Sequence, residues 1–395
     1  MYRNNRLATW MFGLAMAPLA GLAAAAEDTA PSNQALYEII QAQQDQIEAL
    51  QQNDSGDDWL ARTHIGGYGE LHYNNLSQDD GDHERELDFH RFVLFFGHDF
   101  SDRIRFRSEL ELEHSLAGEG QPGEVELEQA YIEFDIGQGH IARGGLFLIP
   151  VGILNETHEP PTFYGVERNP VENIIIPATW WAGGAGWSSQ FDSGLSFDFA
   201  VHEGLAVPTA GGSAYRIRSG RQKTAEANAN NLAYTGRLRY TGIPGLELAA
   251  SAQYQSDVSQ IENDGLNDAV LLSSHLVLER GRFGLRALYA QWQLNGSGPS
   301  AADVDDQDGW YVEPSVKLLN CLGLYARYSS VDAARDADRF NELEIGANFW
   351  PHPNVVIKAD LRQREHDLSS ESGNDFDGFD PVSYTHLTLP TIYSV

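Results

Sequence analysis

Hydrophobic and polar residues alternate one by one along most of the chain from Arg62 onward. In Arg103–Glu113, charged Arg or Glu side chains occupy every second position, with mainly apolar side chains between them. Only a β-strand places these two sets on opposite faces. The same pattern predicts fifteen strands: His64–Tyr73, Leu87–His98, Arg103–Glu113, Val125–Ile136, Ile141–Ile149, Ala185–Phe191, Gly194–His202, Leu232–Thr241, Leu246–Gln255, Val270–Leu278, Phe283–Trp292, Trp310–Leu318, Leu322–Ser329, Leu343–Phe349 and Val355–Leu361.

The connections between these segments are alternately short and long. Short connections such as Asp99–Asp102 and Glu279–Arg282 alternate with long polar ones such as Glu203–Asn231 and Asn295–Asp308. Outer-membrane barrels have short periplasmic turns and longer external loops, and strands of alternating hydrophobicity. A soluble sandwich or propeller gives no reason for this regular alternation in length. The pattern therefore predicts an all-β, transmembrane, antiparallel up-and-down β-barrel.

Two further segments precede the predicted barrel. Residues 1–26 have a basic start, an apolar run and an ending of small residues, which is the layout of a secretory signal peptide. An uncleaved membrane anchor is the alternative, which the shortness of the apolar run disfavours. Residues 33–52 carry the a/d spacing of a short coiled-coil helix, which we expect to be an accessory oligomerisation helix or a solvated linker helix. The seam residues are Leu36, Ile40, Gln43, Ile47 and Leu50.

Composition excludes several functions. The chain has 26 Lys+Arg against 57 Asp+Glu, a formal charge of −31, so we expect no nucleic-acid partner. The single Cys321 excludes an intrachain disulfide framework and a cysteine-based zinc site. Common catalytic motifs such as G-x-S-x-G and H-E-x-x-H are absent, so we predict no catalytic residues, no enzyme activity and no cofactor. An outer-membrane barrel enzyme and a plugged structural or adhesive barrel remain the alternatives to a channel.

Five segments resemble the bacterial phosphate-selective porin O/P-like family, and the resemblance covers roughly residues 63–362. It implies a sixteen-stranded, homotrimeric channel in the bacterial outer membrane, in contact with membrane lipid and lipopolysaccharide. It also implies passive diffusion of small hydrophilic or ionic solutes, with anions such as phosphate as candidates. The acidic excess prevents transfer of the basic pore ladder known from phosphate-carrying members. The segments are Leu87–Glu113, Gly123–Asp135, Pro150–Gly184, Gly309–Lys317 and Val355–Asp360.

The C-terminal end departs from the family pattern. Such barrels normally close with an amphipathic strand that ends in an aromatic residue. Val382–Val395 does not alternate, contains Pro390 and resembles translated sequencing-adapter text. We therefore interpret residues 382–395 as a non-native tail and residues 62–381 as the barrel domain, with about fifteen strands present and a sixteenth missing. A genuine odd strand number is the alternative.

The third long connection, Pro150–Gly184, is rich in proline, which fixes φ and favours a defined loop shape. In trimeric porins the third loop narrows the barrel, and the resemblance implies the same here. Bracing against the barrel wall by ion pairs is the alternative role for the polar side chains of this loop. Imidazole and carboxylate groups also bind metals, but we predict no metal site here. The candidate constriction residues are Asn155, Glu156, His158, Glu159, Glu167 and Arg168.

Basic residues gather beside the short turns, and parity places most of them on the face turned away from lipid. A charge on the lipid face near the midplane would cost roughly 2–4 kcal/mol, which favours the lumen. The long loops are strongly acidic, so we predict a basic inner zone behind an acidic mouth, with paired bracing as the alternative role for the arginines. The candidate pore-lining residues are Arg103, Arg105, Arg107, Glu109, Glu111, Arg237, Arg239, Arg286 and Lys358.

Overall fold

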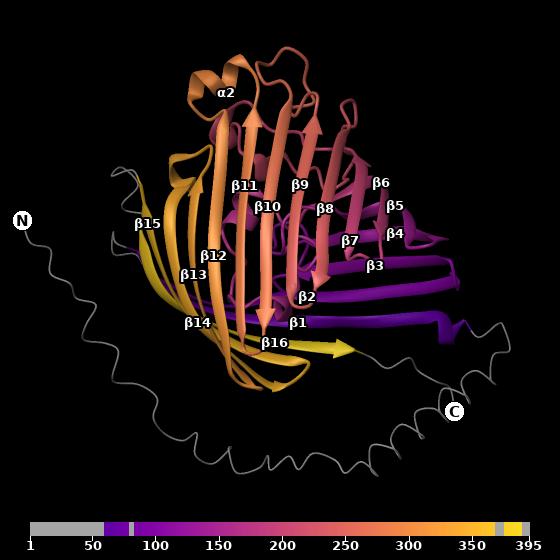
Figure 1. Cartoon of the computed structure of the whole chain (residues 1–395). Helices are drawn as coiled ribbons and strands as arrows, with labels where there is room; N and C mark the ends of the chain where they lie inside the picture. Colours follow the sequence, from indigo (N-terminus) through magenta and orange to yellow (C-terminus); the bar gives the residue numbers. More distant parts are fainter. Residues whose placement is uncertain (1–58, 79–82, 368–374, 389–395) are drawn as a thin grey trace, which may run out of the picture. The chain divides into compact units, whose positions relative to one another are not determined.

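The computed structural model describes residues 59–78, 83–367 and 375–388. Sixteen strands form one closed antiparallel barrel, in which each strand pairs with its sequence neighbours and β1 pairs with β16 (Figure 1). This confirms the predicted fold class. The strands are β1 (Thr63–Gln78), β2 (His83–Ser101), β3 (Ile104–Glu113), β4 (Val125–Gly137), β5 (His140–Leu148), β6 (Trp181–Gln190), β7 (Leu195–His202), β8 (Ala233–Ile243), β9 (Leu246–Gln255), β10 (Ala269–Arg280), β11 (Phe283–Leu294), β12 (Asp306–Leu319), β13 (Leu322–Asp332), β14 (Arg339–His352), β15 (Val355–His366) and β16 (Phe376–Thr388).

The alternation of residue types decides which face of each strand points outward. In β9, Leu248 and Tyr254 are 41% and 45% exposed, whereas Gln253 and Gln255 are only 2% and 0% exposed. Apolar side chains therefore cover the outside of the wall and polar ones point inward. This is the reverse of a soluble barrel and is the arrangement that a lipid surrounding requires.

Short turns and long connections alternate around the barrel, as predicted. The turn between β8 and β9 needs Gly245, because its φ of 78° lies in the left-handed region. A Cβ atom there would also lie 2.1 Å from the Glu279 carbonyl oxygen. The long connections carry short helical segments: α2 (Ser297–Ala302), η3 (Pro160–Thr162), η4 (Val171–Ile175), η5 (Gly211–Ser213), η6 (Ile217–Gly220) and η7 (Asp336–Asp338); η2 (Leu60–Arg62) precedes β1.

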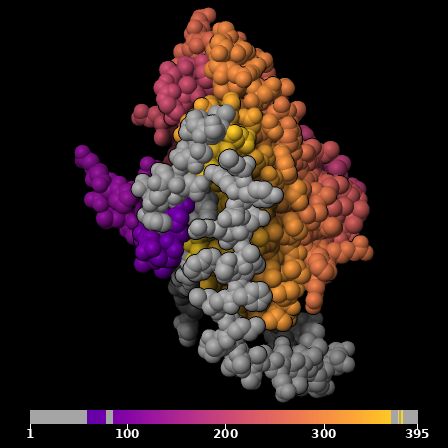
Figure 2. All heavy atoms as spheres, turned by 90° about the vertical axis from the view of Figure 1, so that its left-hand side faces the viewer, coloured from indigo at the N-terminus to yellow at the C-terminus, as the bar shows by residue number. Residues whose placement is uncertain are grey.

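The closing strand β16 is the main difference from the sequence-based expectation. The pattern predicts that a sixteenth strand is missing, but residues 376–388 pair with β1 on one side and with β15 on the other. The first and last strands accordingly lie side by side in Figure 2. Backbone donors and acceptors on both open edges favour pairing whatever the side-chain pattern of the added strand. The non-native origin of residues 382–395 stays a prediction.

Two predicted segments, the signal peptide at residues 1–26 and the coiled-coil helix at residues 33–52, lie outside the described residues. In the part of the chain that the structure describes, no helix combines the length and apolarity needed to cross a bilayer.

Candidate functional site

The third long connection, residues 149–180 between β5 and β6, folds into the barrel. Near its start, His158 approaches β3 and β4, and Glu156 forms an ion pair with Arg237 on β8. Farther along, the loop is bonded to β15 through Lys358, and Glu172 accepts a hydrogen bond from the Tyr311 hydroxyl on β12. These contacts reach around most of the inner wall, so the loop lies across the lumen.

Asn155 ties the two ends of the third loop together. Its side chain is fully buried. The Nδ2 group donates to the carbonyl oxygens of Ile149 at 2.7 Å and Trp180 at 2.8 Å, and Oδ1 accepts the Trp180 N–H at 2.6 Å. One side chain therefore satisfies three backbone groups where the loop leaves and rejoins the wall.

Asn155→Ala is expected to destabilise the barrel by about 2–4 kcal/mol, because buried backbone groups that lose a partner cost about 1–3 kcal/mol each. Urea unfolding of the refolded, detergent-solubilised chain measures this loss. The matched control is Thr157→Ala, which removes one exposed hydrogen bond to the Ile153 carbonyl in the same loop. Equal losses for the two variants would contradict the proposed clasp.

His158 anchors the first part of the loop to the wall. Its Nε2 atom lies 3.2 Å from Glu109 Oε1 on β3 and 3.1 Å from Glu128 Oε2 on β4. All three side chains are at most 3% exposed. Burial alone would lower the pKa of His158, but the hydrogen bonds and charges of Glu109 and Glu128 outweigh burial and raise the pKa to about 10. The imidazole is therefore protonated at neutral pH and balances the adjacent carboxylates.

A buried group of charges on β12–β15 holds the middle of the loop. Lys358 Nζ donates to the carbonyl oxygens of Phe163 at 2.9 Å and Gly165 at 2.8 Å. Asp360 Oδ2 accepts the Val166 N–H at 2.8 Å. Arginine and carboxylate partners on the neighbouring strands complete this group. We call it the clamp cluster: Glu313, Arg327, Glu344, Lys358 and Asp360.

Three arginines predicted to line the pore are held in ion pairs. Arg105 Nη2 lies 2.8 Å from Glu133 Oε1. Arg107 Nη1 lies 2.8 Å from Asp99 Oδ1. Arg237, which is 5% exposed, pairs with Asp198 at 2.8 Å and also with Glu156. The geometry at these positions is that of paired bracing, the alternative role considered from the sequence.

The other predicted lining residues have different surroundings. Arg103 is exposed in the turn between β2 and β3. Arg239 Nε donates to Ser196 Oγ at 3.3 Å, and Arg286 Nη2 donates to the Thr162 carbonyl at 2.7 Å. Glu111 Oε2 lies 3.4 Å from Arg91 Nη1. Arg286 therefore supports the third loop.

The remaining constriction candidates lie in the second half of the loop or at η3. Glu159 is partly exposed, and its carbonyl accepts the Thr162 N–H at 3.0 Å. Glu167 Oε1 lies 3.1 Å from His72 Nδ1 on β1. Arg168 has a buried Nη2 atom that makes no hydrogen bond within the described residues. Their role in permeation stays a prediction.

Between the third and fourth loops, the predicted Arg168 is joined by three arginines that were not predicted from the sequence: Arg216, Arg218 and Arg221. Arg218 donates to the third-loop carbonyls of Asn173 at 3.0 Å and Ala178 at 2.7 Å. Burial, followed by repulsion from the neighbouring guanidinium groups, lowers the pKa of Arg218 well below its usual value. The signal was present, because residues 216–223 hold three arginines and a lysine in an acidic chain. The arginine cluster is Arg168, Arg216, Arg218 and Arg221.

An apolar cluster fills part of the lumen beside the loops. Trp180 and Ile175 from the third loop and Ile217 from the fourth meet inward-facing residues such as Trp292 on β11 and Phe340 on β14. Trp292 Nε1–H donates to the Ile175 carbonyl at 2.9 Å, so its polar atom is satisfied. Burial of this apolar area fixes the loops against one side of the wall.

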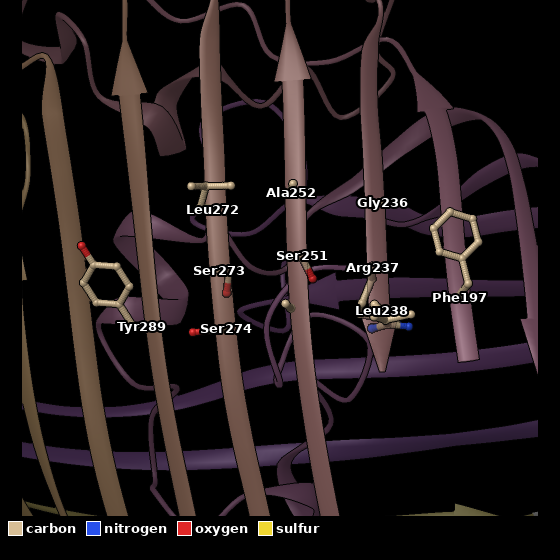
Figure 3. Close-up of a pocket in the computed structure, with 11 residues that line it drawn as sticks. Phe197, Gly236, Arg237, Leu238, Ser251, Ala252, Leu272, Ser273, Ser274 and Tyr289 are labelled. Carbon is tan, nitrogen blue, oxygen red and sulfur yellow. The ribbon is translucent and has the colours of Figure 1, made fainter. Parts of the chain in front are cut away.

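A separate hollow of about 420 Å³ lies in the barrel wall across β7–β11 (Figure 3). Its rim includes Phe197, Leu238, Leu272 and Tyr289, which are 41–51% exposed on the outer face. Small residues such as Gly236 leave the space between them. The hollow therefore belongs to the outer surface of the barrel.

Comparison with known sequences gives one informative relative. No protein-family model matches the chain. An uncharacterized protein from Aquifex aeolicus (strain VF5) is 31% identical over 333 residues, which cover 76% of this chain and 76% of that protein.

Solved structures of similar fold include an anion-selective porin and an outer membrane channel. The anion-selective porin from Comamonas acidovorans has a TM-score of 0.61 at 12% identity, over 82% of this chain and 99% of that one. OmpF of Salmonella typhi has a TM-score of 0.56 at 14% identity, over 82% and 97%. The outer membrane channel DcaP of Acinetobacter baumannii has a TM-score of 0.55 at 12% identity, over 82% and 97%. The barrel thus has the fold of porins.

Proposed function

The chain belongs to the same family as the uncharacterized Aquifex aeolicus protein, and we propose that it forms a water-filled channel in the bacterial outer membrane. Small hydrophilic or ionic solutes would cross it by passive diffusion. The porin fold supports this proposal. The observation that carries it is the third loop, which is bonded to several sides of the lumen wall and would set its cross-section. Similar folds are mostly those of porins, so we propose no enzymatic activity.

The sequence resemblance supports proposals about the family, export, oligomeric state and surroundings of the protein. We propose membership of the phosphate-selective porin O/P-like group, export by the signal peptide at residues 1–26, and a homotrimer in contact with lipid and lipopolysaccharide. The acidic long loops, which include Asp303, Asp305 and Asp306, would face the outside and bind divalent ions that bridge lipopolysaccharide.

We further propose that anions pass more readily than cations, with phosphate as a candidate solute. The arginine cluster supports this preference, because its hydrogen-bonded partners at Arg218 and Arg221 are backbone carbonyls. Charged side chains along a pore select ions by local potential, so a net charge of −31 does not decide the selectivity. The Comamonas acidovorans porin is described as anion-selective and shares the fold.

Planar-bilayer recording of the refolded full chain tests both the channel proposal and the proposed preference for anions. We expect discrete conductance steps and, in a KCl gradient, a reversal potential on the chloride side. Arg168→Gln with Arg221→Gln should lower the chloride-to-potassium permeability ratio on the order of two- to fivefold. Arg280→Gln with Arg282→Gln is the matched control, because it removes the same charge from an exposed short turn. An equal shift in both double variants would refute a local role for the arginine cluster.

A plugged barrel is the second candidate, and the apolar cluster in the lumen favours it. The same recording separates the two functions. Absence of conductance from a correctly folded barrel would remove the channel proposal and support a structural or adhesive role. Folding is checked by the heat-modifiable electrophoretic mobility of the barrel.

A further inference from the structure

A second group of polar side chains lies on the inner wall, at β2 and the end of β3. Asp88 Oδ2 is 3.2 Å from His90 Nδ1 and 2.8 Å from His114 Nδ1. One candidate ligand atom from each of the three side chains lies within 4.8 Å of the other two. The side chains are 15%, 27% and 33% exposed, so water and ions reach them. We call this group the histidine–aspartate cluster: Asp88, His90 and His114.

A β-bulge lies in β2 beside this cluster. The pairing of β1 with β2 moves from Glu70↔Arg91 to His72↔Asp88, so β2 carries one extra residue there. Such an extra residue changes the face to which the following side chains point. Asp88 and His90 share a face by parity, and the bulge allows Arg91, the direct neighbour of His90, to face the lumen as well, 3.0 Å from Glu70.

The strand partners hold the two imidazoles close to each other. The His114 N–H donates to the His90 carbonyl at 3.1 Å, so the two histidines are cross-strand neighbours. The His72 ring stacks on the His90 ring with centroids 4.4 Å apart. His72 is itself held by Glu70 at 2.7 Å and by Glu167 at 3.1 Å. The site therefore has rigid support on the strand wall, as metal ligands need.

The donor set has the chemistry of a transition-metal site. Two imidazole nitrogens and one carboxylate oxygen suit zinc, copper or nickel, whereas calcium and magnesium take oxygen ligands. Ligands at about 2.0–2.2 Å from a tetrahedral ion lie about 3.3–3.6 Å from one another. The observed 2.8 Å and 3.2 Å separations need only small side-chain movements to reach this spacing.

We propose that Asp88, His90 and His114 bind one divalent transition-metal ion of the zinc class in the lumen, with water in the remaining coordination position. The ion would bind the two Nδ1 atoms in place of their hydrogen bonds to Asp88, and each ring would keep one proton on Nε2. The ion would add positive charge near the third loop, because the His90 ring stacks on His72, which in turn contacts Glu167. This proposal stands apart from the channel function, because binding does not require solute passage.

A second triad of possible ligands, Glu109, Glu128 and His158, fits the chemistry less well. Its ligand atoms also converge, but the three side chains are at most 3% exposed. An ion would have to displace the loop anchor to enter. The experiment therefore treats this triad as a control.

Equilibrium dialysis of the refolded full chain against Zn²⁺, after removal of metal by a chelator, tests the proposal. We expect one zinc ion per chain, unaffected by a hundredfold excess of Ca²⁺. Asp88→Asn, His90→Ala and His114→Ala should each weaken binding by at least about tenfold. The controls His158→Gln and His275→Gln should bind zinc as the unchanged protein does. His275 is a matched lumen histidine on β10, paired with Glu247 at 3.0 Å.

The results distinguish a metal site from a group of side chains that only stabilise the barrel wall. Folding of each variant is checked by heat-modifiable mobility, so a loss of binding counts only in a folded barrel. If the three cluster variants fail to fold, Co²⁺ absorption of the unchanged protein decides, since a four-coordinate tetrahedral Co²⁺ site absorbs visible light far more strongly than the hydrated ion. Absence of saturable zinc binding would overturn the proposal, as would a loss of binding in His158→Gln alone. Conductance is not needed for either conclusion, so failure of the channel proposal remains distinguishable.

Discussion

Arg327→Met is expected to destabilise the barrel by about 3–5 kcal/mol and to loosen the third loop. Arg327 is 1% exposed and pairs with Glu313 at 3.1 Å and with Glu344, which are 3% and 2% exposed. Removal of one partner from a buried ion pair leaves charge without compensation, and such losses reach about 3–5 kcal/mol. Because the clamp cluster also bonds the backbone at residues 163–166, we expect noisier and larger conductance steps.

The measurements are urea unfolding and planar-bilayer recording on the same preparation. Arg339→Met is the matched control, since Arg339 on β14 pairs with Asp332 at 3.1 Å and the two side chains are 25% and 62% exposed. A more exposed pair contributes about 1 kcal/mol or less. Adding Glu344→Gln to Arg327→Met should recover part of the loss, because it neutralises a stranded carboxylate. If Arg327→Met costs no more than Arg339→Met, the clamp cluster does not hold the loop.

The anchor at His158 is expected to make stability depend on pH between about 6.5 and 10. The pKa of His158 is raised from 6.5 to about 10 in the folded chain, by Glu109 and Glu128 against the effect of burial. Its contribution is therefore complete below pH 6.5, declines as pH rises, and is lost above about pH 10. The full shift corresponds to roughly 5 kcal/mol, or about 1.4 kcal/mol for each pH unit in this window.

Unfolding midpoints of the unchanged protein and His158→Gln at pH 6.5, 8 and 9.5 measure this effect. The difference between the two proteins should be largest at pH 6.5 and shrink steadily toward pH 9.5, which separates His158 from other titrating groups. His140→Gln is the control, because His140 bonds the Ser189 hydroxyl at 2.9 Å and faces no carboxylate partner in that bond. A constant difference across the three pH values would show that the imidazolium does not anchor the loop.

The strands could be predicted because their signal is local. The alternation in Arg103–Glu113 needs no knowledge of any other segment, and the strand formed there is β3, Ile104–Glu113. Closure could not be predicted in the same way. Closure requires β16 to pair with β1, which lies at the other end of the chain, so the weak alternation of residues 376–388 gave no indication of it.

The location of the candidate site could be predicted from the sequence, but the ion-pair partners of its residues could not. The prolines and charges of residues 150–184 marked the third loop, which does enter the barrel. The pairing of Arg107 with Asp99 depends on the hairpin register, and that of Arg237 with Glu156 depends on a loop that enters from elsewhere. Parity assigns a residue to a face but cannot identify its partner across the lumen. The bulge that allows both His90 and Arg91 to face the lumen is likewise invisible to a strict period of two.

The bonds between the third loop and β15 also constrain the order in which the molecule can assemble. Lys358 and the carbonyl of Phe163 are 195 positions apart in the chain. The entropy cost of such a distant contact is met only once the intervening strands are in place. The loop can therefore form its hydrogen bonds to β15 only after nearly the whole sheet has formed. Until then, the newly assembled wall surrounds a loop that is not yet bonded to it. In the proposed channel, the strands that join last would thus set the width of the passage, although the loop that would narrow it lies much earlier in the chain.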